Sequence, residues 1–337
     1  MTTRLSSHQY IDRQTRRVKT EKLIADALLN RLYSGARENP SLLFKMITSK
    51  RMSALLALFH YDLQRPVKNP RRDPRILPIG IDWSESLDPP ERLNTIRKVF
   101  ERKLTYWRFR PMSDERESVA SPADARMVVG SFDVHNALFL KEKFFSYEEL
   151  FSRTKSQWIH AFAGGDFGIF RLTPDKYHYN HLPVSGKVVD LYVVDGQCHS
   201  CNPGAVVSMV TPFSKNRRVV TIIDTDVPGG TGIGQVAMIE IVAMMIGEIV
   251  QCYSLRAYDA PSKIVPGMFV EKGCPKSLYR PGSSVDVVVF QKNRVVFSPD
   301  ILANMRRRDV TSRFTVNFKQ PLVETDVKVR SEIARQK

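Results

Sequence analysis

The sequence has few cysteines, no apolar run long enough to cross a membrane, and fewer acidic than basic residues. Its four cysteines are too few and too clustered for a disulfide-stapled scaffold, so we expect a reducing compartment. The longest apolar segment, residues 236–250, is interrupted by Glu240 and Glu248 and falls short of the roughly 18 residues that span a bilayer. Residues 1–22 are polar and basic, unlike a signal peptide. Any membrane contact is therefore expected to be peripheral.

Two of the cysteines, Cys198 and Cys201, form a C-x-x-C pair with His199 between them. A structural metal site would need a second pair or histidines at ligand spacing. Cys252 and Cys274 do not supply one. We therefore expect no metal site, and we assign the pair to a strand or turn.

The charge of the chain is strongly positive. It carries 51 Lys and Arg against 35 Asp and Glu, a formal net charge of +16. This balance favours an anionic partner such as nucleic acid, acidic lipid headgroups or an anionic substrate, and does not choose among them. The hydrophobic content of 42% is that of an ordinary globular protein.

The first hundred residues are expected to be helical and basic. Apolar side chains repeat at helical spacing over residues 22–33, 40–60 and 90–102, with a Pro- and Arg-rich linker at 64–78. In the second helix the apolar stripe consists of Met52, Leu55, Leu56 and Phe59. This helix packs as part of a hairpin on the main domain, lies as a basic amphipathic surface on anionic lipid, or does both with different faces.

The pattern changes near residue 117, where short β-branched runs begin to alternate with turn residues. The expected strands include residues 126–129, 167–172, 187–194, 218–224 and 285–290. We therefore predict an α+β protein with two parts. Residues 1–110 form a basic, amphipathic helical region that contacts a membrane or partner, and residues 111–337 form a β-rich catalytic domain.

Four short segments carry residues suited to chemistry. They are SPADAR at 121–126, YHYNHLPVSG at 177–186, SKNRRVV at 214–220 and RPGSSVDVVVF at 280–290. Taken singly, each has an ordinary explanation. Asp124 suits a turn after a proline, His178 and His181 suit a strand end, and the Gly282-Ser283 pair suits a tight turn.

In this order and spacing the segments resemble the phosphatidylserine decarboxylases. That family carries an SPxDG-like segment, a YHxxHxP segment, an NxR-type segment and a terminal GST or GSS before an apolar strand. Further matches are LKEKFFSYEELF at 140–151, IVAMMIGEI at 241–249, and Lys272-Gly273 ahead of Gly282, as in the family's KGxxxGxF run. The resemblance carries motifs over residues 121–290.

The chain also departs from the family pattern, although at none of the proposed Asp, His or Ser positions. Ser277 stands where the KGxxxGxF run has its second glycine. The other departures are Ala125, Arg217, Val242, Glu248 and Pro281. These positions bear on which headgroup the site accepts.

The resemblance implies a proenzyme that makes its own prosthetic group. The Ser283 hydroxyl would attack the Gly282 carbonyl to give an ester, and β-elimination would then split the chain between 282 and 283. The serine would become a pyruvoyl group. Its ketone would form a Schiff base with the substrate amine, and its amide carbonyl would take up the electrons as CO2 leaves. This group replaces pyridoxal phosphate, for which the sequence offers no site, and no metal is expected.

The catalytic roles follow from the same resemblance and from side-chain chemistry. A serine hydroxyl needs a base, and His181 is the candidate because imidazole exchanges protons near neutral pH. Asp124 is expected to orient and charge-stabilise that ring. His178 is expected to protonate the substrate carbanion. Ser284 would assist as a hydrogen-bond partner, and Asn216 is a supporting residue.

The predicted activity converts phosphatidylserine in an anionic membrane to phosphatidylethanolamine and CO2. The large chain 1–282 and the small chain 283–337 are expected to stay paired. The family resemblance also implies a homodimer, placed peripherally on the cytoplasmic face of a membrane, the cell membrane if the source is bacterial. No nucleic-acid motif is present, so nucleic acid is not expected as a partner.

Three alternatives remain open from the sequence. One is a pyruvoyl-dependent decarboxylase of a free amino acid on the same scaffold. Another is a non-enzymatic basic binding protein. The third is a degenerate relative that no longer cleaves itself, which Ala125 and Arg217 keep open.

Overall fold

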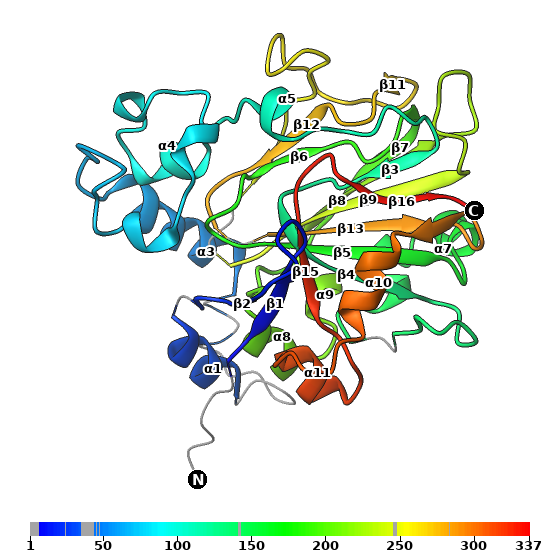
Figure 1. Ribbon diagram of the computed structural model, residues 1–337, viewed down its shortest axis with the longest axis horizontal. Coiled ribbons are helices and arrows are strands. Elements are labelled where there is room, and N and C mark those ends of the chain that lie inside the picture. The colour runs from blue at the N-terminus through cyan, green and yellow to red at the C-terminus, as the bar shows by residue number, and fades with distance from the viewer. Residues whose placement is uncertain are drawn as a thin grey trace.

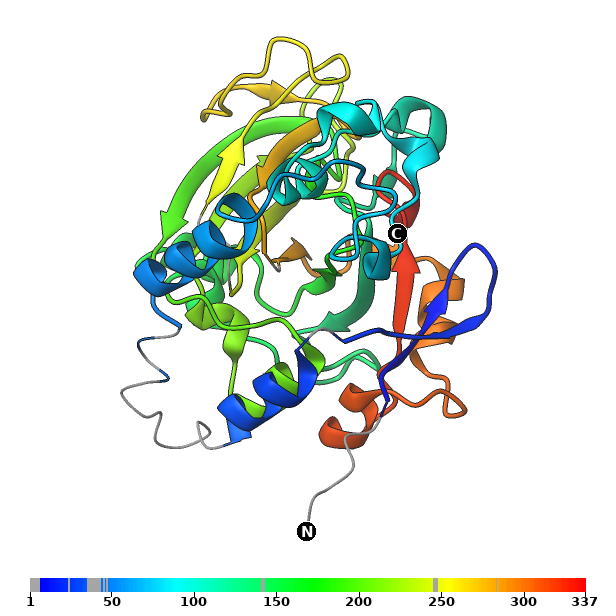
Figure 2. The ribbon, with the colours of Figure 1, turned by 90° about the vertical axis from the view of Figure 1, so that its left-hand side faces the viewer.

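A computed structural model describes residues 7–23, 25–34, 44, 46, 48–140, 143–244, 248–282 and 284–337. Within these residues ten strands form one large, curved sheet (Figures 1 and 2). In spatial order the strands are β11 (Phe269–Val270), β7 (Gly186–Val194), β8 (Arg218–Asp224), β9 (Gln235–Val242), β13 (Ser284–Phe290), β5 (Asp166–Leu172), β4 (Ala125–Ser131), β15 (Glu324–Val327), β1 (Gln9–Asp12) and β2 (Val18–Thr20).

Strand β13 lies in the middle of this sheet. All seven of its residues are buried, and each pairs antiparallel with β9 on one side and β5 on the other. Its run of valines suits a strand that is covered on both faces, because β-branched side chains pack well on a pleated surface. The strands expected at 126–129, 167–172, 187–194, 218–224 and 285–290 are confirmed.

Two three-stranded sheets accompany the large one. The first contains β10 (Ile249–Gln251), β12 (Pro275–Tyr279) and β6 (Tyr179–His181), and the second contains β14 (Val295–Phe297), β16 (Glu332–Gln336) and β3 (Ser118–Ala120). Strand β12 ends at Tyr279 and β13 begins at Ser284. The segment expected to be cut therefore joins the first small sheet to the centre of the large one.

The helices are short and surround the sheets (Figure 1). In chain order they are α1 (Asp26–Ser34), α3 (Lys50–Ala57), η1 (Leu58–Asp62), η2 (Leu77–Ile79), η3 (Trp83–Glu85), η4 (Pro90–Arg92), α4 (Ile96–Phe100), α5 (Tyr106–Phe109), α6 (Tyr147–Phe151), α7 (Ser156–Ala161), α8 (Pro203–Ser208), α9 (Pro212–Lys215), α10 (Pro299–Met305) and α11 (Arg313–Phe318). Together with the sheets they confirm the predicted α+β, β-rich fold class.

The N-terminal region differs from expectation in two respects. Strands β1 and β2 belong to the main sheet, because β1 pairs in parallel with β15 near the C-terminus. The segment expected to be a linker is packed, since Val67 and Ile76 are buried in a cluster with Tyr61 and Phe100. A hydrophobic cluster of its own, from Ala57 to Phe100, holds these helical segments together, whereas the two-part division at residue 110 stays a prediction.

The apolar stripe on α3 and η1 points outward. Leu55 and Phe59 are 44% and 55% exposed, while Ala57 and Tyr61, on the opposite side, are buried. Leu58 and Leu63 extend the exposed surface. Met52 and Leu56 of the same stripe are half-buried, so this segment packs within the chain on one face and exposes apolar side chains on the other. Among the described residues, no helix is both long and apolar enough to cross a membrane.

Candidate active site

The two histidines of the YHYNH segment lie beside the strand that leads to the proposed cleavage site. His181 is in β6, which pairs antiparallel with β12, and His178 immediately precedes β6. The backbone N–H of Tyr279 donates to the carbonyl of His178 over 3.0 Å. Sheet pairing thus brings together segments about a hundred residues apart in the sequence.

Gly282 has a backbone conformation that suits glycine alone. Its φ is 147°, in the region that other residues rarely adopt, and it follows Pro281. Ser283, the proposed nucleophile, lies outside the described residues. Ser284 opens β13 and is fully buried, and its hydroxyl has no hydrogen-bond partner among the described residues. A buried hydroxyl without a partner is costly and suits a group reserved for chemistry.

The ring of His181 is held at both nitrogens. Nδ1 lies 2.8 Å from the carbonyl of Gly273, and Nε2 lies 3.0 Å from the hydroxyl of Tyr177. Because a carbonyl can only accept, Nδ1 carries the hydrogen and Nε2 is left as the basic nitrogen. Burial lowers the pKa of His181 to about 3, although the Gly273 carbonyl and the charge of Asp124 oppose this shift. The ring is therefore neutral at physiological pH and able to accept a proton.

Asp124 does not pair directly with His181, contrary to the sequence expectation. Its carboxylate accepts two hydrogen bonds from Arg110, at 2.9 and 2.7 Å, and one from the backbone N–H of Val329 at 2.8 Å. Burial would raise the pKa of Asp124, but the charges of Arg110 and Lys328 outweigh it and hold that pKa far below its usual range. A guanidinium binds a carboxylate with two parallel bonds, which makes Arg110 a better partner than an imidazole.

Asp124 still belongs to the same cluster as His181. The backbone N–H of His181 donates to the carbonyl of Pro122, two residues before Asp124, over 2.7 Å. The negative charge of Asp124 also favours a protonated His181. The charge-stabilising half of its expected role stays a prediction, while the contacts that hold the ring of His181 come from Gly273 and Tyr177.

His178 is buried against an aromatic ring. It stacks on Phe100 of α4, with ring centroids 3.7 Å apart and planes 17° apart. Neither ring nitrogen makes a well-formed hydrogen bond within the described residues, although the Pro174 carbonyl favours its protonated form. Burial, assisted by the positive charge of Arg102, lowers the pKa of His178 to about 3. A neutral ring with unengaged nitrogens suits proton transfer to or from a bound substrate.

Asn216 bonds to the backbone next to the start of β13. Its amide donates to the carbonyls of His199 and Val242, and its oxygen accepts from the backbone N–H of His199. Val242 is the register partner of Ser284. Asn216 thus fixes the end of β9 next to the start of β13, a supporting role without contact to a described catalytic group.

Sequence reasoning missed several residues of this site. Tyr177 is the first residue of the YHYNH motif, so the motif itself could have identified it as a site residue. Its hydroxyl oxygen also lies 2.7 Å from that of Tyr258. Arg110 and Phe100 lie in the helical region, where no pattern marked them. Their positions depend on how that region folds back onto the sheet (Figure 1).

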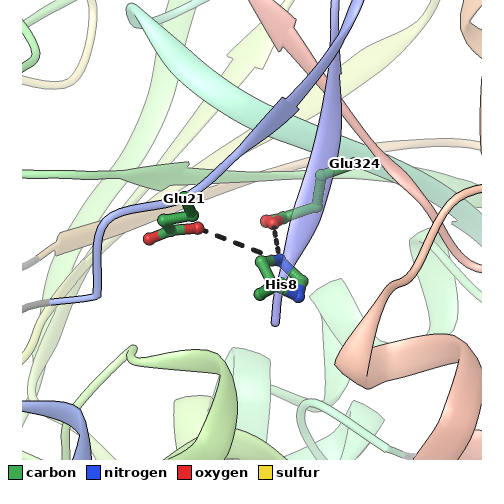
Figure 3. A group of neighbouring side chains, drawn as sticks. All are labelled: His8, Glu21 and Glu324. Atoms are coloured by element: carbon green, nitrogen blue, oxygen red, sulfur yellow. Dashed lines mark hydrogen bonds and ion pairs between the residues drawn. The ribbon is translucent and has the colours of Figure 1, made fainter. Parts of the chain in front are cut away.

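A buried charged cluster lies on the large sheet, close to the N-terminus (Figure 3). The ligand atoms of His8, Glu21 and Glu324 lie within 4.8 Å of one another, a spacing that a metal ion would accept. However, Arg171 already donates to both carboxylates over 2.6 to 2.9 Å, and Arg126 pairs with Glu21. Two arginines balance two carboxylates, which is the arrangement of a buried ion-pair network.

Cys198 and Cys201 are buried in the loop that follows β7, where Gln197 forms a bridge to Asn216. This location agrees with the strand-or-turn assignment made from the sequence.

Comparison with known proteins supplies the chemical context. The family model described as phosphatidylserine decarboxylase matches residues 96–309. A phosphatidylserine decarboxylase proenzyme of Fusobacterium nucleatum is 28% identical over 307 residues, covering 89% of this chain and 93% of that protein. One of Ruminiclostridium cellulolyticum is 28% identical over 295 residues, covering 87% and 91%. Proenzyme 2 of Oryza sativa is 33% identical over 231 residues, covering 67% and 34%.

Proposed function

The chain belongs to the phosphatidylserine decarboxylase family and is a carboxy-lyase, and we propose that it decarboxylates phosphatidylserine after cutting itself between Gly282 and Ser283. The observation that carries this proposal is the pairing of β6 with β12. It sets the buried His178 against Tyr279, the residue that ends β12 three residues before the Gly282–Ser283 bond, and the buried His181 opposite Pro275, where β12 begins. The glycine-only backbone of Gly282 supports it, because an unhindered carbonyl suits attack by a neighbouring hydroxyl.

The residues fit a pyruvoyl group formed from Ser283. Such a group would supply the ketone that receives the substrate amine and the carbonyl that takes up electrons during loss of CO2. The Ser284 hydroxyl, buried and without a described partner, is available as a hydrogen-bond donor next to it. His178, which is neutral in this structure, would first take up a proton from the substrate amine as the Schiff base forms and would then return it to the substrate carbon, while Phe100 covers its ring and excludes water.

For the self-cleavage step, His181 is the proposed base. Nε2 would take the hydroxyl proton of Ser283, and the negative charge of Asp124 would stabilise the imidazolium that forms. Tyr177 donates to the same nitrogen, so it must release Nε2 when the serine approaches.

Two measurements on the purified protein test this function. Intact mass spectrometry should give a chain ending at Gly282 and a chain beginning with a pyruvoyl group at position 283. Incubation with vesicles that contain phosphatidylserine should release CO2, whereas free serine should not. Turnover of free amino acids alone would favour the same-scaffold alternative. A single intact chain without activity would favour a degenerate relative or a binding protein.

We further propose that the two chains stay associated after the cut. The proposed small chain would contribute β13 to the centre of the large sheet and β15 to its edge region, next to β4 and β1. The ion-pair network formed by the three residues of Figure 3 and Arg171 also crosses between the proposed chains, since Glu324 follows the cut and the other three residues precede it. Burial would raise the pKa of Glu21, but Arg171 and Arg126 hold it at about 2, so this carboxylate stays charged.

Glu324→Gln should weaken the association of the two chains without blocking cleavage. Removing one charge from a buried network leaves the others uncompensated and costs about 3–5 kcal/mol. The measurement is the urea concentration at which the small chain separates in size-exclusion chromatography. Asp300→Asn is the matched control, because its pair with Arg13 also joins the two chains but is half exposed, and should cost about 1 kcal/mol or less. Equal urea resistance of the two variants would contradict the proposal.

We also propose that α3 and η1 form the membrane-docking surface. Their exposed Leu55, Leu58 and Phe59, together with Leu63, offer apolar side chains to insert at an interface. Exposed cations follow them in the chain and suit anionic headgroups. These cations are Arg65, Lys68, Arg71 and Arg72. The buried side of the same helical segment leads to the active site, because Phe100 packs on Tyr61 of η1 and on His178.

The double variant Phe59→Asp/Leu63→Asp should bind phosphatidylserine vesicles at least about tenfold more weakly, because each buried apolar side chain contributes roughly 1.5–3 kcal/mol. Vesicle cosedimentation measures this, and intact mass confirms that cleavage is unaffected. Val316→Asp on α11 is the control, since Val316 is exposed but lies outside this surface. Unchanged sedimentation of the double variant would place docking elsewhere. The homodimer and the cytoplasmic face stay predictions, to be tested by sedimentation equilibrium and by cell fractionation.

A further inference from the structure

One phenol oxygen joins the strands on both sides of the proposed cleavage site. Tyr279, the last residue of β12, is fully buried. Its hydroxyl oxygen lies 3.0 Å from the backbone nitrogen of Ile241 in β9, 3.0 Å from the carbonyl of Val285 and 2.7 Å from Oδ1 of Asp286, both in β13. Ile241 and Val285 face each other in the β9–β13 register. The hydroxyl therefore ties the strand before the cut to the strand after it.

Counting hydrogens assigns the charge state of Asp286. The Ile241 N–H can only donate, the Val285 carbonyl can only accept, and the phenol carries one hydrogen. All three contacts are satisfied when Tyr279 donates to Val285 and a protonated Asp286 donates to Tyr279. Burial and the charge of Glu240, its register partner, raise the pKa of Asp286 well above its usual range. Its Oδ2 has no described partner, which costs less for a neutral acid than for a carboxylate.

The charge of Glu240 beside this contact is balanced by a buried cation. Glu240, the nearest carboxylate, is paired with the buried ammonium of Lys276 over 2.5 Å and also accepts from the hydroxyl of Ser277. Ser277 and Tyr279 stand where the family's KGxxxGxF run has glycine and phenylalanine. The hydroxyls of Ser277 and Tyr279, which bond to groups in β9 and β13, are therefore features of this chain beyond the family pattern.

We propose that Tyr279 and Asp286 are positioning residues for self-cleavage, whose hydrogen bond holds the end of β12 and the start of β13 at one fixed separation before the backbone is cut. This inference rests on the self-cleavage proposed above. Neither residue transfers a proton to the reacting atoms. They limit the conformations of the connecting segment, and pre-organisation of this kind lowers the barrier to an intramolecular attack.

Freshly translated variants, followed by gel electrophoresis over time, test the proposal. Tyr279→Phe should slow cleavage about tenfold, the loss expected for one ordinary hydrogen bond, because Asp286 is left without a partner. Asp286→Asn should cleave near the wild-type rate, because an amide can still donate to the phenol. The double variant Tyr279→Phe/Asp286→Val removes both polar groups and should recover most of the rate. Tyr192→Phe, which loses a bond from a tyrosine to Phe151 far from the cut, should behave as wild type.

Each variant is also made in the Ser283→Ala chain, where the thermal midpoint reports packing without cleavage. If Tyr279 has a purely structural role, Tyr279→Phe will lower the thermal midpoint and leave the cleavage rate unchanged, and that result would overturn the proposal. Slow cleavage in the double variant Tyr279→Phe/Asp286→Val would also overturn it. If Tyr279→Phe does not fold, the cleavage rates of Asp286→Asn and Asp286→Val are compared instead. Equal rates for these two variants would overturn the proposal. Absence of cleavage in the wild type would instead refute the proposed function.

Discussion

Ser283→Ala will remain a single full-length chain and will not release CO2 from phosphatidylserine. Without the hydroxyl, no ester can form at Gly282, so neither the cut nor the pyruvoyl group can arise. The expected effect is complete loss, because the electron sink itself is absent and no side chain replaces it. Intact mass spectrometry checks the first part, and trapping of CO2 from carboxyl-labelled substrate checks the second.

The control for this variant is a buried serine elsewhere. Ser131→Ala in β4 removes a hydroxyl that bonds to the carbonyl of Gly165, and the protein should still cleave and turn over. Turnover by uncut Ser283→Ala protein would refute the mechanism, whereas cleavage of that variant would move the nucleophile to another residue such as Ser284.

His181→Ala should slow self-cleavage by at least about a hundredfold, the lower range for loss of a general base. The geometry supports a specific role, because the Gly273 carbonyl fixes the hydrogen on Nδ1 and leaves Nε2 as the proton acceptor. Time courses of newly made protein on gels measure the effect. His199→Phe is the matched control. His199 is also a buried, neutral histidine, and a phenyl ring can keep its stacking on Phe44.

The pH dependence of cleavage provides a second check on His181. Its folded pKa is lowered to about 3, so lowering the pH from 8 to 5 should leave the ring neutral and the cleavage rate nearly constant. An exposed histidine base would lose activity below its ordinary pKa of about 6.5. A rate that falls tenfold by pH 5.5 would therefore show that the acting base is not the buried His181 of this structure.

The sequence alone determined the centre of the sheet and the chemistry. The β-branched run from Val285 to Val289 predicts a strand covered on both faces, and that strand is β13. The YHYNH and GSS segments contain the residue types that the proposed self-cleavage needs, whereas the pairing of β6 with β12, which ends three residues before the proposed cut, is a feature of the folded chain. These features are local, because strand propensity and side-chain chemistry are properties of the residues themselves.

Only the tertiary structure decided which charged groups meet. The partner of Asp124 is Arg110 rather than His181, since the helical region returns to the sheet and delivers a guanidinium to a buried carboxylate. Glu324 meets His8 across 316 positions because β1 pairs with β15. The apolar stripe of α3 faces outward because Tyr61 and Ala57 fill the core of the helical unit instead. Such contacts join distant segments, and no local pattern encodes them, since they depend on how whole elements pack.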